Sequence, residues 1–204
     1  REATYKKLSR LHHVEFLEGP RVLVLSPHPD DDVFGCGGTL IRHVAMGHEV
    51  HIVYLCRGDK GISGLPLDQV AQIRKEEATV AASLMGIPQD HLHFWDESDY
   101  QLKVTSSTIK RLNQITEQLK PNLVYLPSFT DNHPDHLQTN HIFKDAHTPS
   151  FWVAAYEVWT PHIPNRIVDV SQEISQKMDA MKAHTSQLKS LSYHDGILGL
   201  NKYR

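Results

Sequence analysis

The sequence predicts an α/β fold, a single Rossmann-like domain with a mostly parallel sheet flanked by helices. Short apolar runs, of the kind that is buried on both faces of a parallel sheet, recur along the chain. Longer segments rich in helix-forming residues lie between them, which is the spacing of βαβ units. The 204 residues suffice for one core, and no repeat or linker divides them. We therefore expect one domain over residues 1–204, with residues 1–20 as an N-terminal arm.

Short apolar or alternating segments predict the first three strands, at residues 22–25, 50–55 and 91–95. Two helices are predicted between these strands, at residues 39–45 and 68–85. Gly47 is typical of the residue that follows a helix, and Asp68 is typical of an N-cap. Gly86 and Pro88 end the second helix, because neither residue favours its continuation.

The rest of the chain predicts three more strands, at residues 123–127, 151–160 and 166–170. Three helices accompany them, at residues 106–119, 136–145 and 171–188. Ser106 or Ser107 is expected to cap the first of these helices, which ends before Pro121. Ser171 is expected to cap the last one.

The composition excludes several classes of function. The 21 basic and 24 acidic residues give a net charge of −3, which argues against a nucleic-acid-binding surface. No apolar run is long enough for a membrane-spanning helix, and no signal peptide is visible. Cys36 and Cys56 are too few for a disulfide framework, so we expect a cytoplasmic protein in which both are inert packing residues.

Histidines and carboxylates gather in two segments that directly follow predicted strands. Pro27-His28-Pro29-Asp30-Asp31-Asp32 follows the first strand, and Asp131-Asn132-His133-Pro134-Asp135-His136 follows the fourth. Ligands of an open α/β sheet bind at the carboxyl ends of its strands. Proline stiffens both segments, so each can aim several side chains at one point.

These residue types suit a catalytic metal site, which needs about three nitrogen or oxygen ligands and an open position. His28, His136 and one aspartate of the pair 30–31 meet that need, and the other aspartate is left as a general base. His133 is placed to face a developing oxyanion or leaving group. Asp135 lies between two histidines and is expected to orient one of them. Zinc is the expected cation, and Fe²⁺ suits the same donors.

Four segments together resemble the PIG-L/LmbE-like N-acetylglucosaminyl deacetylases, which are zinc-dependent enzymes that remove acyl groups, mostly acetyl, from amino sugars. In chain order, the segments are residues 26–31 running into 35–40, residues 74–86, residues 133–136, and residues 182–188. The similarity thus spans roughly residues 21–190, and the order and spacing of the segments make it specific.

The resemblance implies a role for each matching residue. It implies a metal bound by His28, Asp31 and His136. Asp30 would be the general base, and His133 would stabilise the tetrahedral intermediate or act as an acid. Arg74 would contact the sugar or its substituents. The chain departs from some relatives at Asp131, where they carry a tyrosine that helps the oxyanion.

Several of these residues, and others nearby, also have a simpler structural interpretation. Asp32 is expected to be a solvent-facing or helix-N-terminal charge, and Arg74 could be an exposed partner of Glu77 on its helix. The glycines at 35–38 lack the dinucleotide-binding pattern and are expected to allow close packing of a helix on the sheet. Further histidines are expected to be surface, strand or packing residues with no carboxylate cluster beside them, namely His12, His13, His91, His93 and, on a helix, His184.

The sequence therefore predicts a metal-dependent enzyme that removes the N-acetyl group from an N-acetylglucosamine-type sugar or conjugate. An esterase or phosphoesterase with the same site is one alternative, and a sugar- or nucleotide-binding module without catalysis is another. The expected partner is a small acylated amino sugar rather than nucleic acid or membrane. A homo-oligomer is also compatible with the resemblance, because relatives are often multimeric.

Overall fold

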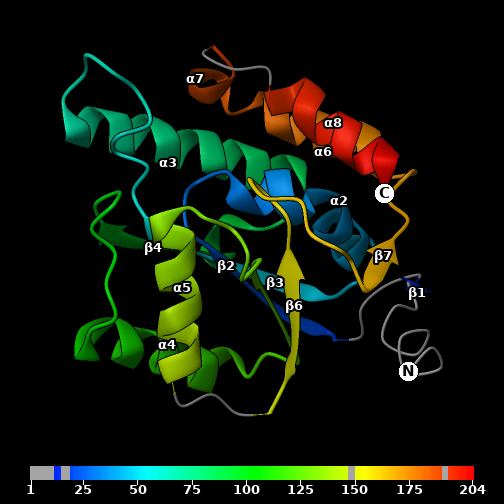
Figure 1. Ribbon diagram of the computed structural model, residues 1–204, viewed down its shortest axis with the longest axis horizontal. Coiled ribbons are helices and arrows are strands. Elements are labelled where there is room, and N and C mark those ends of the chain that lie inside the picture. Colours follow the sequence, from blue (N-terminus) through cyan, green and yellow to red (C-terminus); the bar gives the residue numbers. More distant parts are fainter. Residues whose placement is uncertain (1–11, 15–18, 147–149, 190–192) are drawn as a thin grey trace.

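The fold is organised around one parallel sheet of five strands, which confirms the predicted α/β class (Figure 1). The computed structural model describes residues 12–14, 19–146, 150–189 and 193–204, so most of the expected N-terminal arm lies outside the described residues. The strand order is β4-β3-β2-β5-β6, and every neighbouring pair is parallel. No helix in the described ranges is long and apolar enough to cross a bilayer.

The strands of this sheet lie close to their predicted positions. They are β2 (Arg21–Ser26), β3 (Glu49–Cys56), β4 (Leu92–Glu97), β5 (Leu123–Pro127) and β6 (Trp152–Tyr156). The strand expected at 166–170 is not part of the sheet. It forms β7 (Arg166–Val168), which pairs with β1 (His12–Val14) in a separate two-stranded sheet.

The helices differ from the predictions mainly at their ends. The helices and the short 3₁₀ turn η1 are α2 (Asp31–Ala45), α3 (Leu67–Leu84), η1 (Gln89–His91), α4 (Ser106–Leu119), α5 (Pro134–Asp145), α6 (Ile174–Lys182), α7 (Thr185–Leu188) and α8 (Tyr193–Tyr203). Thr105 caps α4 through a reciprocal pair of hydrogen bonds with Thr108, whereas Ser106 or Ser107 was expected. Asp68 lies within the first turn of α3, and the N-cap is Pro66.

The predicted helix at 171–188 is divided in two. Helix α6 ends at Lys182, and α7 begins at Thr185, so the chain turns at His184. Helix α8 follows the undescribed residues 190–192 and has no counterpart among the predicted elements. Its three leucine and isoleucine residues lie within four positions, between 197 and 200, and so do not repeat at a helical period.

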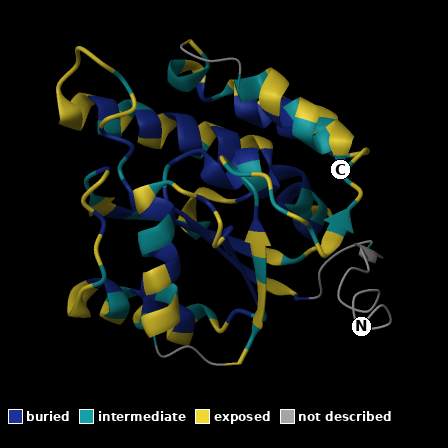
Figure 2. Cartoon of the chain, viewed as in Figure 1, coloured by how far each residue is buried: buried dark blue, intermediate teal, exposed yellow. Residues whose placement is uncertain are grey.

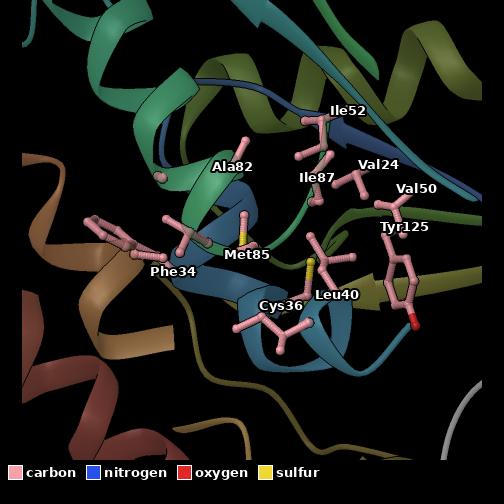
Figure 3. Packing of buried hydrophobic residues seen from close by; sticks show 14 of the residues in the cluster. Val24, Phe34, Cys36, Leu40, Val50, Ile52, Ala82, Met85, Ile87 and Tyr125 are labelled. Carbon is pink, nitrogen blue, oxygen red and sulfur yellow. The ribbon is translucent and has the colours of Figure 1, made fainter. Parts of the chain in front are cut away.

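Helices cover both faces of the sheet, and each face has its own apolar core. Alternate residues of a strand point to opposite faces. Val22 and Val24 therefore pack toward α2, α3 and α6. Figure 3 shows Leu40 and Ile87 near Val24, with Met85 further along the same cluster. Leu23 and Leu25 pack toward α4 and α5. Figure 2 shows the central strands buried and much of the edge strand β6 exposed.

Helix α2 begins at Asp31, ahead of its predicted start at residue 39, and so includes the glycines at 35–38. These glycines bring the helix close to its neighbours, as the sequence predicted. A Cβ atom on Gly35 would lie 2.3 Å from Cδ2 of Tyr156, and one on Gly38 would lie 2.9 Å from Cβ of Val170. Close packing against the sheet stabilises α2 despite the low helix propensity of glycine.

We expect Gly35→Ala to destabilise the protein, because the added methyl group overlaps the Tyr156 ring. Overpacking of this kind costs about 1–3 kcal/mol, so thermal unfolding should occur at a lower temperature. Gly196→Ala is the matched control, because Gly196 lies in α8 with nothing within 4 Å of its Cβ position. There the gain in helix propensity, about 1 kcal/mol, should leave the melting temperature equal or higher. Equal losses in both variants would contradict this account.

Candidate active site

Two histidine- and aspartate-rich loops meet at the carboxyl edge of the sheet, as the sequence predicted. Strands β2 and β5 are hydrogen-bonded neighbours, so the segments that follow them emerge side by side. Each loop leads straight into a helix. Asp30 is the N-cap of α2, and His133 is the N-cap of α5 with Pro134 as its first residue. Proline is favoured at that position because its missing N–H would have no partner there.

Asp31 lies between the histidines of the two loops. Its Oδ2 is 3.0 Å from Nδ1 of His28 and 3.0 Å from Nε2 of His136. The same oxygen accepts the backbone N–H of His28 at 2.9 Å. The three side chains that the sequence predicted as metal ligands therefore converge on one point. The rings of His28, His133 and His136 also lie close enough together for all three to contact one cation.

Two further carboxylates hold the histidine rings in place. Oδ2 of Asp131 lies 3.2 Å from Nδ1 of His136, and Asp131 also accepts the backbone N–H groups of His133 and Trp159. Oδ2 of Asp135 lies 3.1 Å from Nε2 of His28. The sequence had assigned Asp135 to one of the histidines beside it. The structure corrects this, because the Asp135 carboxylate reaches across to His28 and Asp131 takes the place beside His136.

The charges in this cluster favour protonated imidazoles when no cation is present. Burial lowers the pKa of His28, but hydrogen bonds to Asp135 and Asp31 outweigh burial and raise it to about 10. Burial also lowers the pKa of His136, and the nearby Asp31 and Asp131 carboxylates raise it to about 9. Both ring nitrogens of His136 are buried, and neither makes a well-aligned hydrogen bond within the described chain. With Asp131 beside Nδ1, the Nε2 that faces Asp31 is the nitrogen of His136 that could bind a cation.

His133 has a fixed tautomer in its neutral form. Its Nδ1 accepts the backbone N–H of Asp135 at 3.2 Å, which caps helix α5. A nitrogen that accepts a hydrogen bond carries no proton, so the proton of the neutral ring resides on Nε2. Burial lowers the pKa of His133, and the neighbouring His28 and His136 lower it further, so the neutral form is favoured. His133 lines the cleft and presents a hydrogen-bond donor rather than a base.

Asp30 is paired with Arg74. Nη2 of Arg74 lies 3.1 Å from Oδ1 of Asp30, and both side chains line the cleft. Arg74 is only 2% exposed, so the plainer interpretation of an exposed partner of Glu77 is wrong. Glu77 instead accepts hydrogen bonds from Thr185 and Ser186, which attach α7 to α3.

Asp32 is buried, which contradicts the expected solvent-facing charge, although it does lie in the first turn of α2. The Tyr54 hydroxyl donates to its Oδ2 at 3.1 Å, and Ser26 Oγ accepts its backbone N–H at 3.1 Å. Burial raises the pKa of Asp32 to about 7 despite the tyrosine, with Asp30 and Asp31 adding to the rise. Asp32 does not line the cleft, and its buried contacts are those of a residue with a structural role.

The cleft above these residues encloses about 690 Å³, part of which is open to solvent. Its lining includes Gln187, from the C-terminal segment of the resemblance, and side chains that the sequence did not single out, among them Lys60, Asp99, Tyr100, Trp159 and Tyr193. Asp99 follows β4 at the same edge of the sheet and accepts the backbone N–H groups of Gly58 and Lys60. The two main loops were located because ligands of such sheets bind at the carboxyl ends of the strands. The same reasoning could also have located Asp99. Nothing in the local sequence marks Trp159 or Tyr193, since tertiary packing alone brings them here.

Both cysteines are buried and unpaired, as predicted, and His184 is a buried packing residue against Phe34. Cys56 ends β3 close to His28 and Asp135, and its thiol offers a further donor at the margin of the cluster. Burial raises the pKa of the Cys56 thiol, with the neighbouring Asp135 adding to the rise, which keeps it protonated and unreactive.

Clustered imidazoles and carboxylates at the carboxyl edge of a parallel α/β sheet define a candidate metal centre at the place where such sheets bind ligands. Comparison with known families narrows the class of protein. The family described as PIG-L, GlcNAc-PI de-N-acetylase, matches residues 23–147, and the chain belongs to this family.

Individual relatives agree with the family. The chain is 25% identical to a probable N-acetyl-α-D-glucosaminyl L-malate deacetylase of Bacillus anthracis, covering 86% of this chain and 88% of that protein. It is 30% identical to the uncharacterized deacetylase YaiS of Escherichia coli, over 81% and 90% of the two chains. The solved N,N′-diacetylchitobiose deacetylase of Pyrococcus horikoshii superposes with a TM-score of 0.77 at 28% identity, over 91% and 79% of the chains.

We expect zinc binding to the cation-free protein to release protons and to strengthen as the pH rises from about 6 to 8. The pKa values of about 10 for His28 and 9 for His136 mean that both rings are protonated in this range. A cation binds only the neutral imidazole, so it must displace these protons, and a higher pH makes the displacement easier. Calorimetric titration in buffers of different ionisation enthalpy counts the protons. Binding that is independent of pH, with no proton released, would refute the expectation.

Proposed function

We propose that the protein is a metal-dependent hydrolase that removes the N-acetyl group from an N-acetylglucosamine-type amino sugar or conjugate. The convergence of His28, Asp31 and His136 on one point, with the Asp30 carboxylate beside them in an open cleft, carries this proposal. Family membership supports it, because the relatives named above are deacetylases. The single domain of residues 1–204 would act in the cytoplasm, where buried unpaired cysteines such as Cys36 and Cys56 stay reduced.

His28, Asp31 and His136 would hold the cation. The fit rests on their mixed nitrogen and oxygen donors and on the short distances that join Asp31 to both imidazoles. Zinc is the proposed cation, and Fe²⁺ suits the same donors. When bound, such a cation polarises the amide carbonyl and makes a water molecule more acidic. Asp131 and Asp135 would orient the two histidines, which metal-binding imidazoles generally require.

The chain's own residues would then move the protons. Asp30 accepts a proton from the attacking water, whose oxygen forms a bond to the carbonyl carbon. Arg74 holds the Asp30 carboxylate in place through the contact at 3.1 Å. The Nε2–H of His133 donates a hydrogen bond to the carbonyl oxygen as it becomes negative. The C–N bond breaks as the amine takes a proton from Asp30, which leaves acetate and the free amino sugar.

The cleft has the surface character that binds sugars. Tyr100 and Trp159 are 61% and 48% exposed at its rim and offer flat apolar faces for a sugar ring. Arg74 also lines the cleft, and its Nε and Nη1 are buried without an acceptor among the described residues. This arrangement supports the role in sugar binding that we propose for Arg74.

Hydration is the competing chemistry, and one comparison favours it. The 4-oxalmesaconate hydratase of Pseudomonas putida is 30% identical over 132 residues, which cover 61% of this chain and half of the hydratase.

A panel of N-acetylated sugars, including N-acetylglucosaminyl malate and diacetylchitobiose, should release acetate only with the metal-loaded enzyme. Hydration of an unsaturated acid, or release of phosphate from a phosphoester, without any acetate release would refute the proposed deacetylase.

Asparagine at each of the three consecutive aspartates should have a different effect. Asp30→Asn removes the base and should lower kcat by about 10²–10⁴-fold while metal content stays near that of the wild type. Asp31→Asn removes a ligand and should lower metal content as well as activity. Asp32→Asn is the matched control, because this carboxylate is buried against Tyr54 away from the cleft and its variant should keep most activity. Acetate release and elemental analysis measure the two properties. Loss of metal with surviving activity in Asp30→Asn would reverse the first two roles.

A further inference from the structure

A second group of side chains that could bind a metal lies at the amino ends of strands β3 and β4, on the side of the sheet opposite the candidate active site. Glu49, His51 and His91 offer ligand atoms that all lie within 4.8 Å of one another. Glu49 begins β3, whereas Cys56 ends it close to His28. The two ends of this extended strand are about 20 Å apart. The group is therefore separate from the candidate active site, and it was not expected, because the sequence showed no carboxylate cluster beside His91.

Strand pairing creates this group. Residues 49 and 51 of β3 share one face, and β4 runs parallel beside them with Ile52 opposite Leu92 and Val53 opposite His93. His91, at the end of η1, directly precedes β4 and is thereby placed beside His51. Their rings stack with centroids 4.0 Å apart and an interplanar angle of 24°. Neither ring can move far without disturbing the strand pair.

The hydrogen bonds around the rings prepare the two histidines to bind a cation. Nδ1 of His91 lies 2.9 Å from the carbonyl oxygen of Val50 and can only donate to it, so the lone pair of the neutral ring is on Nε2. Nε2 of His51 lies 2.9 Å from Oε1 of Glu49, and because a carboxylate only accepts, the cation-free ring donates its Nε2–H to Glu49. A cation held by Glu49 and His51 would displace that proton, and Nδ1 of His51, which lies 3.2 Å from Nε2 of His93, would then donate to His93. Imidazole ligands of metals are generally fixed by such a second hydrogen bond.

We propose that Glu49, His51 and His91 form a second binding site for a divalent cation of the zinc class, with His93 orienting His51. Two imidazoles and a carboxylate suit zinc, nickel or copper better than magnesium or calcium, which prefer oxygen ligands alone. The Glu49 side chain is half exposed, so a cation and its remaining water ligands can reach the group.

The electrostatic surroundings support ionisation of the carboxylate. The pKa of Glu49 is lowered by the hydrogen bond with His51, with His91 and Arg21 adding smaller effects. Arg21 lies opposite Glu49 in β2, and its guanidinium is held by the carbonyl oxygen of Lys120. A bound cation would join β3 to η1 and the start of β4, so this site would stabilise the sheet edge and not take part in the hydrolysis.

Zinc stoichiometry of the full chain tests the proposal. After chelation and dialysis against zinc, the wild type should bind one equivalent more than the double variant Glu49→Gln, His91→Ala. His141→Ala is the matched control, since His141 is an exposed histidine on α5, and it should bind as much as the wild type. Acetate release by the metal-loaded double variant should equal that of the wild type. Because the readout is stoichiometry, it stands even where the proposed deacetylase activity fails.

A second measurement needs no substitution and so does not depend on the folding of a variant. Diethyl pyrocarbonate modifies accessible imidazole nitrogens, and peptide mass spectrometry locates the modified residues. Saturating zinc should slow modification of His91 and leave His141 unchanged. Two results would overturn the proposal: equal stoichiometry in the wild type and the double variant, or equal modification of His91 with and without zinc. The group would then be only a hydrogen-bonded network that binds no cation.

Discussion

The pairing of β2 with β5 is the constraint on which the candidate site depends. The two strands are parallel neighbours, so the loops after them emerge at the same edge, and Asp31 can contact His28 and His136 together. Neither loop alone supplies the three proposed ligands, His28, Asp31 and His136. Because the two loops are about a hundred residues apart in sequence, the site exists only while the sheet is intact. Activity and the central fold should therefore be lost together.

Three adjacent aspartates show how backbone direction separates chemical roles. Asp30 ends the loop as the helix N-cap and faces Arg74, whereas Asp31 turns toward the histidines. Asp32 points into the protein toward Tyr54, where burial raises its pKa to about 7. The start of α2 at residue 31 produces this divergence, since successive residues of a helix point about 100° apart. An extended loop through all three residues would have placed alternate carboxylates on the same side.

The sequence was sufficient for the main sheet and for both site loops, because continuous apolar strands and proline-stiffened polar turns are local signals. It failed where tertiary packing overrides local preference. The glycines at 35–38 disfavour a helix locally, yet α2 includes them because it must approach Tyr156 closely. Asp135 appeared to belong to its neighbours in sequence and reaches His28 instead. Trp159 and Tyr193 enter the cleft from C-terminal segments whose positions no local pattern specifies.

Asp131 replaces the tyrosine that some relatives carry, and its contacts show what the replacement changes. It lies 3.2 Å from Nδ1 of His136 and accepts two backbone N–H groups, so it cannot also donate to a substrate oxygen. An ionised carboxylate at this position strengthens His136 as a ligand, because it favours a proton on Nδ1 and leaves the lone pair on Nε2. The donor to a developing oxyanion must then come from elsewhere in the cleft. In the proposed mechanism His133 would be that donor, since the cap of α5 already fixes its proton on Nε2. In the proposed mechanism, the expected contribution of a tyrosine at this position would therefore fall to His133 alone.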